Sequence, residues 1–140
     1  MLSRIANSLL WTGRYLERAQ YTARYIHVHC FGALDAPILS RKEFVLDSIT
    51  TMTGLSYEYP DKGKNINNNE LIYRATLDEF NPVSIKASVF KARENARGAR
   101  DILSSELWES INKFYHCVNA WNSKKMSEDD ILGYTEMIVE

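Results

Sequence analysis

An apolar stripe at helical spacing runs through the first thirty residues and limits this chain to folds that can cover a long helix. The stripe recurs at steps of three and four, the period of one face of an α-helix. Its members are Ile5, Leu9, Thr12, Leu16, Ala19, Ala23, Ile26 and Cys30. No proline occurs between residues 3 and 31, and Gly32 follows the last turn. The pattern therefore predicts one helix over 3–30, about 40 Å long.

A second and longer periodic pattern follows Asn81-Pro82, where proline suits the first turn of a helix. Its apolar positions stay in phase from residue 85 to residue 121, a span equal to about ten turns of 3.6 residues. They are Ile85, Val89, Ala92, Ala96, Ala99, Leu103, Leu107, Phe114, Val118 and Trp121. This predicts one helix of about 40 residues over 82–121. A kink near Gly98 or the Ser104-Ser105 pair is the alternative.

Shorter helices are predicted between and after these two. Ser40 and Glu43 form a capping box for a helix over 40–53, and a short helix follows over 70–78. Proline, glycine and asparagines over 56–69 predict a mobile surface loop. Ser127, followed by Asp130, caps a last helix that runs to residue 140, and no segment alternates like a strand for more than a few residues. We therefore predict a single all-α domain over 1–140, a helical bundle of two long helices and two or three shorter ones.

Charge and composition exclude several classes of protein. Seventeen basic and eighteen acidic residues give a net charge of -1, so no global field attracts nucleic acid. No apolar run approaches the roughly 18 to 20 residues that span a bilayer, and the first residues do not resemble a signal peptide. Two cysteines are too few for a disulfide framework and suit a reducing compartment. We therefore predict a cytoplasmic protein that binds neither nucleic acid nor membrane.

Polar chemistry is densest at two places on the predicted long helices. On the first helix, Arg14 and Arg18 flank Glu17, within a second stripe of Leu10, Arg14, Glu17, Tyr21 and Arg24 on the side opposite the first. On the second helix, Arg93, Arg97 and Arg100 lie along the edge of the apolar stripe. Two interpretations stay open: an inter-helix ion-pair network that sets register, or an anion pocket of surplus arginines. We expect Glu17 within ion-pair distance of Arg93 or Arg97.

Other chemistry has little support in the sequence. His27 and His29 point about 200° apart on a helix and cannot hold one ion, and no glutamate has a histidine three residues later. Ser104-Ser105 has no histidine at helical spacing, and no glycine-rich loop follows a strand. We therefore expect no metal, no cofactor and no nucleophilic serine.

The two polar segments resemble the signatures of a bacterial family, the alpha-E domain family, which is named for a helical domain with a Glu-Arg motif. The resemblance begins with residues 2–19, which contain Gly13-Arg14-Tyr15-Leu16-Glu17-Arg18, and continues through Asn81-Pro82 and residues 104–112 to about residue 122. It places the Glu-Arg motif on Glu17 and Arg18. It places the second motif on Arg93, Glu94, Asn95 and Arg97.

The resemblance implies an all-helical protein encoded beside ATP-grasp ligases and transglutaminase-like proteins, with a role in forming or modifying peptides. It implies an accessory protein that binds such a ligase, or its peptide-like or anionic product. Two alternatives stay open: an enzyme that uses Glu17 as acid or base in an arginine-lined pocket, and a structural helical protein without a ligand.

The resemblance also implies a chain of about twice this length with a repeated motif, so this chain resembles an N-terminal half. That implied half, together with the length of the predicted helix over 82–121, leads us to expect a homodimer. The shorter helices of one chain could not readily cover so long an apolar stripe, and a second copy would cover it.

Overall fold

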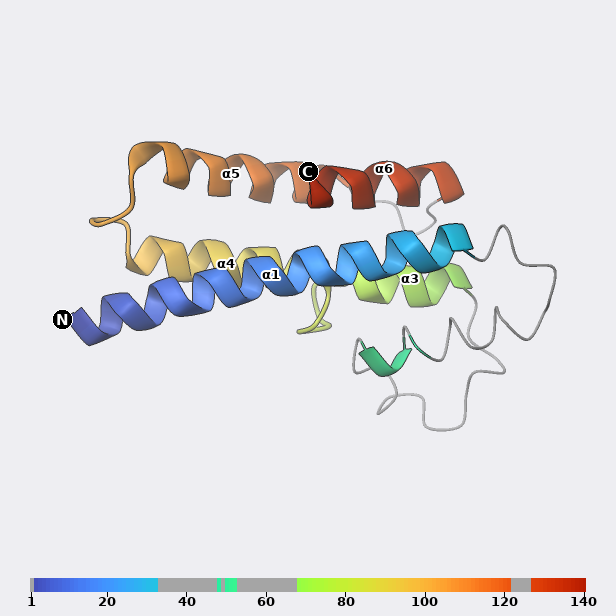
Figure 1. The fold of residues 1–140 in the computed structure, drawn as a ribbon, viewed down its shortest axis with the longest axis horizontal. Helices are drawn as coiled ribbons and strands as arrows, with labels where there is room; N and C mark the ends of the chain where they lie inside the picture. Colours follow the sequence, from blue (N-terminus) through green and yellow to red (C-terminus); the bar gives the residue numbers. More distant parts are fainter. Residues whose placement is uncertain (1, 33–47, 49, 53–67, 122–126) are drawn as a thin grey trace.

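The computed structural model describes residues 2–32, 48, 50–52, 68–121 and 127–140. Its helices are α1 (Leu2–Gly32), α3 (Asn68–Thr76), α4 (Ile85–Gly98), α5 (Ser105–Ala120) and α6 (Glu128–Val139). The described residues contain no strand, so the predicted all-α bundle is confirmed. In Figure 1, α1 extends along the molecule, α3 and α4 lie end to end beside it, and α5 and α6 form a third row.

The first predicted helix is confirmed almost to the residue, because α1 is one helix of 31 residues. Its buried face carries Thr12, Ala19, Thr22, Ala23 and Ile26, four of which belong to the predicted stripe. The stripe predicted the extent of this helix correctly because no proline or internal turn interrupts the helix, so each residue of the stripe keeps its angular position around the axis.

The second predicted long helix is wrong as a single helix. It divides into α4 and α5, and residues 99–104 form a turn between them that reverses the chain (Figure 1). Ser104 adopts an extended backbone and accepts a hydrogen bond from the Leu107 N–H at 3.2 Å, so it caps a new helix. The apolar spacing in the sequence showed no sign of this turn, because Ala99 lies in the turn and is buried there, and it also falls on the helical period of the stripe.

Helices α1 and α4 form the most extensive contact of the bundle, and small residues line it. Ala19 and Ala23 on α1, and Ala92 and Ala96 on α4, are all fully buried. Near the end of α4, a Cβ on Gly98 would lie 3.1 Å from the Ser8 Oγ of α1, so the missing side chain permits a close approach. Short side chains on both helices thus let the two backbones pack closely along the axis of α1.

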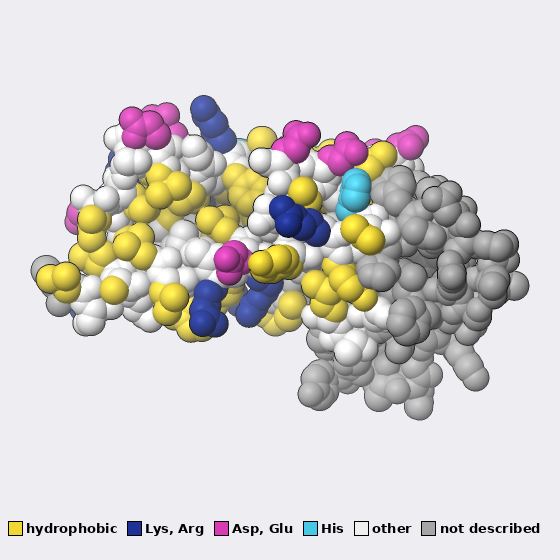
Figure 2. All heavy atoms as spheres, in the orientation of Figure 1, with side chains coloured by type: hydrophobic (Ala, Val, Ile, Leu, Met, Phe, Trp, Pro, Cys, Tyr) yellow, Lys and Arg dark blue, Asp and Glu magenta, His cyan; other side chains and the backbone are white. Residues whose placement is uncertain are grey.

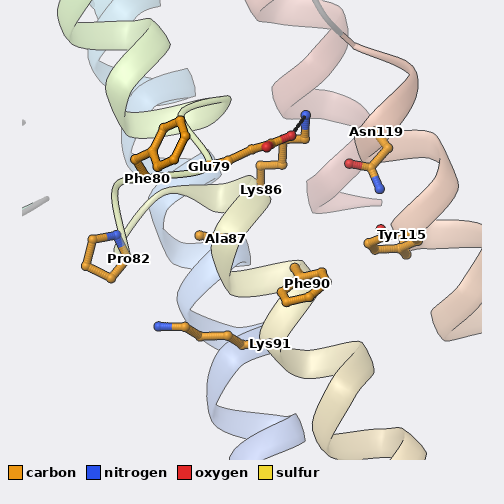
Figure 3. A pocket seen from close by; sticks show the side chains of 9 residues that line it. All are labelled: Glu79, Phe80, Pro82, Lys86, Ala87, Phe90, Lys91, Tyr115 and Asn119. Atoms are coloured by element: carbon orange, nitrogen blue, oxygen red, sulfur yellow. Dashed lines mark ion pairs between the residues drawn. The ribbon is translucent and has the colours of Figure 1, made fainter.

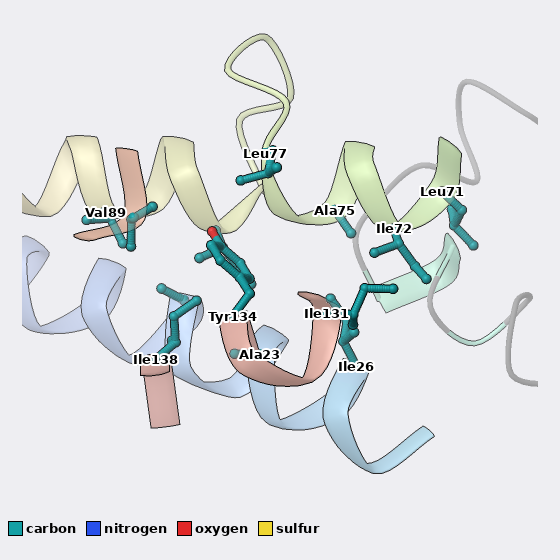
Figure 4. Packing of buried hydrophobic residues seen from close by; sticks show 13 residues of the cluster. Ala23, Ile26, Leu71, Ile72, Ala75, Leu77, Val89, Ile131, Tyr134 and Ile138 are labelled. Atoms are coloured by element: carbon teal, nitrogen blue, oxygen red, sulfur yellow. The ribbon is translucent and has the colours of Figure 1, made fainter. Parts of the chain in front are cut away.

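Larger apolar side chains fill the other half of the molecule, where α1, α3 and α6 meet. Figure 4 shows Tyr134 of α6 among Ile26, Ile72, Ala75 and Ile138, with Leu77 and Val89 alongside. Tyr134 is 0% exposed, and its ring meets Trp121 edge-on at a centroid distance of 5.6 Å. This aromatic pair anchors the C-terminal helix to the core.

A polar contact also joins α6 to α1. The Nδ1 of His27 lies 3.0 Å from the Oγ1 of Thr135, whose hydroxyl hydrogen is directed at helix carbonyls such as that of Ile131, 2.9 Å away. The tautomer of the imidazole determines which of the two groups donates in this contact. The predicted cap of α6 is present too: Ser127 and Asp130 form a capping box, and those hydrogen bonds lower the pKa of the Asp130 carboxyl.

The remaining helix predictions have mixed outcomes. Helix α3 confirms the short helix expected over 70–78, although it begins two residues earlier, inside the end of the loop predicted over 56–69. The rest of that loop lies outside the described residues. Of the helix predicted over 40–53, only residues 48 and 50–52 are described, and they are helical. Within the described part of the chain, no helix combines the length and apolarity needed to cross a bilayer.

The hydroxyl of Tyr134 gives a prediction about stability. Among the described residues it has no hydrogen-bond partner, and its burial raises the pKa of the phenol well above the usual value. Because an unpaired buried hydroxyl destabilises the native state, Tyr134→Phe should raise the free energy of unfolding by about 1 kcal/mol in a urea titration. Ser110→Ala, which removes an exposed hydroxyl on α5, is the control and should change the free energy of unfolding by less than about 0.5 kcal/mol. A loss of stability in Tyr134→Phe would contradict an unpaired hydroxyl.

Candidate functional site

The charged residues of α1 lie on the side of the helix that faces solvent. We define the outer face of α1 by six residues: Leu10, Arg14, Glu17, Tyr21, Arg24 and Val28. All six are exposed, and the three apolar ones are 55%, 58% and 63% exposed. Figure 2 shows basic, acidic and apolar side chains mixed along the side of α1 that is turned to the viewer. The second stripe of the sequence is therefore a real surface of the molecule.

Part of this surface is hollowed. Leu10, Gly13, Arg14, Glu17, Arg18 and Tyr21 line an open depression on α1. A Cβ on Gly13 would meet no atom within 4 Å, so this position of the depression is open space. Arg18 lies over the Tyr15 ring at 5.5 Å and Arg14 lies 6.0 Å from the Trp11 ring centre. The guanidinium groups therefore rest on neighbouring rings of α1.

The predicted ion pair between Glu17 and an arginine of the second polar segment is wrong. Within the described chain, no ion pair or hydrogen bond involves the Glu17 side chain. Glu17 projects from the outer face, whereas α4 packs against the opposite, buried face of α1. A charge on the solvent side of α1 cannot meet one carried by α4. The network interpretation therefore fails for Glu17.

Arg93 instead joins α4 to α5. Its Nε donates to the Oδ1 of Asn112 at 2.7 Å, and its guanidinium lies 4.4 Å from the Tyr115 ring centre. Farther toward the turn, Arg100 lies over the Trp108 ring at 5.3 Å. Arg93 on α4 and Arg100 in the turn thus contact aromatic residues of α5. These contacts stabilise the helical hairpin that α4 and α5 form.

The other residues of the second motif are paired within α4. Arg97 and Glu94 form an exposed ion pair one turn apart, at 3.4 Å, and the Asn95 amide donates to the Lys91 carbonyl at 2.8 Å. The predicted site residues therefore divide into three groups. Arg14, Glu17 and Arg18 are exposed on α1, Glu94, Asn95 and Arg97 are paired within α4, and Arg93 and Arg100 contact α5. The structure does not bring these arginines together into one anion pocket.

A second exposed feature was not predicted from the sequence. Residues before and along α4, with two from α5, line a hollow of about 510 Å³, which we call the aromatic hollow (Figure 3). Its lining comprises Glu79, Phe80, Pro82, Lys86, Ala87, Phe90, Lys91, Tyr115 and Asn119. Phe80 is 95% exposed and Phe90 is 49% exposed, and Ala87 lies between the two in Figure 3. Large exposed apolar rings around a concavity are typical of a binding site.

The loop that presents Phe80 is held by hydrogen bonds. The Phe80 N–H donates to the Asp78 carboxylate at 3.0 Å, the Asn81 amide to the Arg74 carbonyl at 2.7 Å, and the Ser84 hydroxyl to the Asp78 carbonyl at 2.6 Å. The exposure of Phe80 is thus built into an ordered turn. In the sequence, an aromatic residue directly before Asn81-Pro82 and outside the apolar stripe is the signal that would have indicated it.

Charge at the hollow comes mainly from lysines. Lys86 Nζ lies 2.7 Å from Glu79 Oε1, and the hydrogen bond and attraction from Lys86 lower the pKa of the Glu79 carboxyl. Lys91 Nζ lies over the Tyr15 ring of α1 at 5.6 Å. Across the described residues, no group of three or more His, Cys, Asp and Glu side chains is arranged to hold a metal ion. The hollow therefore combines apolar rings with a slightly basic rim.

Comparison with known proteins agrees with the helical architecture. The family model that matches, Alpha-E, is described as "a predicted alpha-helical domain with a conserved ER motif", and it covers residues 1–138. That range is essentially the whole chain, and it extends beyond residues 2–122, where the sequence resemblance was seen. The expectation that the chain matches only an N-terminal half of the family is therefore wrong. Neither a curated protein nor a solved structure matches the chain.

The different surroundings of Glu17 and Asn112 give a paired prediction. Glu17→Gln should change the free energy of unfolding by less than about 0.5 kcal/mol, because the carboxylate is exposed and no described residue pairs with it. Asn112→Ala should cost about 1–2 kcal/mol, because it removes the acceptor of the part-buried Arg93 hydrogen bond. Urea titrations of both variants, at a protein concentration low enough to keep the chain monomeric, measure this. A Glu17→Gln variant that loses as much as Asn112→Ala would contradict the placement of Glu17.

Proposed function

The chain belongs to the Alpha-E family, and on that premise we propose that it is an accessory interaction protein of a peptide-forming or peptide-modifying system. The proposal gives it a partner-binding surface, the aromatic hollow, and a cytoplasmic location, where ATP-dependent ligases work. The observation that carries it is the 95% exposure of Phe80 beside Phe90, on a loop held by hydrogen bonds. A soluble fold gains no stability from an aromatic ring held in water, so a binding role accounts for it best.

The hollow favours a peptide segment as its ligand. An apolar side chain can lie over Ala87 between the rings of Phe80 and Phe90, where it would remove apolar surface from water. Around it, the Asn119 amide offers both a donor and an acceptor for a peptide backbone, and Lys91 offers a positive charge for a carboxylate. We therefore propose that the bound segment carries a large apolar residue next to an acidic one.

The identity of the partner rests on the family resemblance. An ATP-grasp ligase or a transglutaminase-like protein is the partner that this resemblance implies. Either would present a peptide or protein segment of the kind that the hollow suits. The protein would then hold the ligase or its peptide product, with no chemical step of its own.

The geometry gives less support to an enzyme that uses Glu17. Its carboxylate and the neighbouring Arg14 and Arg18 are exposed, and the depression that they line is open to solvent. A general acid or base usually works in a site that excludes water, where burial and fixed charges adjust its proton affinity. The arginines of the second motif do not complete such a pocket, because Arg93 is bonded to Asn112 of α5 and Arg97 pairs with Glu94 on the surface of α4.

Affinity capture from the native cell tests the proposal. The tagged protein should enrich an ATP-grasp or transglutaminase-like protein, and Phe80→Ser should reduce that enrichment about tenfold or more, as expected for losing one buried aromatic contact. Ile102→Ser is the matched control, because Ile102 is also an exposed apolar residue but lies in the turn between α4 and α5. If Phe80→Ser and Ile102→Ser capture the same proteins as the wild type, the hollow is not the binding surface. If the wild type enriches neither class of protein, the proposed partnership is wrong.

A further inference from the structure

The outer face of α1 has the spacing of a coiled-coil seam. Its residues follow one another at alternating steps of four and three, from Leu10 through Arg14, Glu17, Tyr21 and Arg24 to Val28. The same spacing extends back to Asn7 and Ser3. A repeat of 3.5 residues per turn keeps such positions in line against a second helix, and no described helix of this chain covers them.

We propose that two copies of this protein pair through the outer faces of α1, with the two helices antiparallel. A two-fold axis between residues 15 and 16 places Leu10 opposite Tyr21 of the second copy, and Arg14 opposite Glu17 of the second copy. By symmetry each contact occurs twice. Both carboxylates and both central guanidinium groups, which have no ion-pair partner among the described residues of one chain, obtain one of opposite charge.

The charges also select this arrangement over its simplest competitor. In a parallel pairing in register, Arg14 would face Arg14 and Glu17 would face Glu17, and both layers would repel. Only the antiparallel register about residues 15 and 16 matches charge with opposite charge and apolar residue with apolar residue at the four central positions. The face is therefore complementary to itself, which favours a second copy over an unrelated partner.

Gly13 is an independent observation in favour of a packed helix on this side. A glycine inside a helix is less favourable than alanine by up to about 1 kcal/mol, and no other described part of the chain comes within 4 Å of the place where its Cβ would lie. Within one chain, therefore, the described structure gives no reason for a glycine there. A second helix passing across the depression at Gly13 supplies a reason, because the missing side chain lets the two backbones approach.

The inference is independent of the proposed function, because the aromatic hollow is built on α4 and α5 and the outer face belongs to α1. It also differs from the dimer expected from the sequence, which relied on an uncovered stripe along one helix over 82–121. That stripe is divided between α4 and α5, which pack against each other. The face that no described helix covers, and that the proposed dimer uses, is on α1 instead.

Charge reversal tests the register. By light scattering at tens of micromolar protein, the wild type should have a mass of about 32 kDa, twice the 16.2 kDa of one chain. Arg14→Glu and Glu17→Arg should each weaken the dimer at least tenfold, because each creates like-charged layers. Mixing the two variants should restore a dimer with one chain of each kind, since every layer again joins opposite charges. Native mass spectrometry distinguishes this heterodimer from the homodimers.

Glu109→Arg is the matched control, because it makes the same change at an exposed residue of α5 and should leave the dimer intact. A wild-type mass of 16 kDa at 100 µM or above would overturn the inference. So would single variants that dimerise as the wild type does, or a mixture that yields no heterodimer. Circular dichroism of each variant shows whether it is folded, and because these residues are exposed, we expect native helix content in all of them.

Discussion

The close packing of α1 against α4 is the constraint on which the rest of the structure depends. Alanines on both helices, together with Gly98 opposite Ser8, let the two backbones approach along the axis of α1. That contact occupies one side of a helix of 31 residues. It therefore determines which side of α1 remains open, and it places Glu17 and Arg14 in solvent. The larger side chains of α6 then complete the core at the other end, around Tyr134.

The arginines show how one residue type serves two purposes in this fold. Arg93 and Arg100 lie on aromatic rings of α5, where their long apolar stems and planar heads help to close the hairpin. Arg14 and Arg18 lie on rings of α1 itself and keep their charges exposed. Exposed charges contribute little to the free energy of folding, so Arg14 and Arg18 add little to the stability of the fold. In the proposed dimer, the charge of Arg14 instead meets Glu17 of the second copy, and such complementary charges select the register.

Two exposed surfaces of different chemistry result from this arrangement. The outer face of α1 is long, mixed in charge and regular, and it suits another helix. The aromatic hollow is short, concave and mainly apolar, and it suits a single side chain with its flanking peptide (Figure 3). The hydrogen-bonded turn over residues 77–84 maintains the second surface, because it prevents Phe80 from folding back onto the core.

The sequence by itself determined the helical class, the extent of α1, the cap of α6 and the presence of two faces on α1. Each of these depends on local periodicity or on residues three or four apart, which interact within one helix whatever the rest of the chain does. The sequence offered Gly98 and Ser104-Ser105 as places for a kink in the pattern over 82–121. Only the tertiary structure decided that the helix ends there, because the apolar period continues through the turn at Ala99 while the backbone reverses. It alone decided that Glu17 meets neither Arg93 nor Arg97, since the partner of a charge depends on which face of a helix its neighbour covers. The tertiary structure also decided that Phe80 is exposed. The hydrogen bonds of a turn hold that ring in solvent, and the apolar periodicity of the sequence does not indicate them.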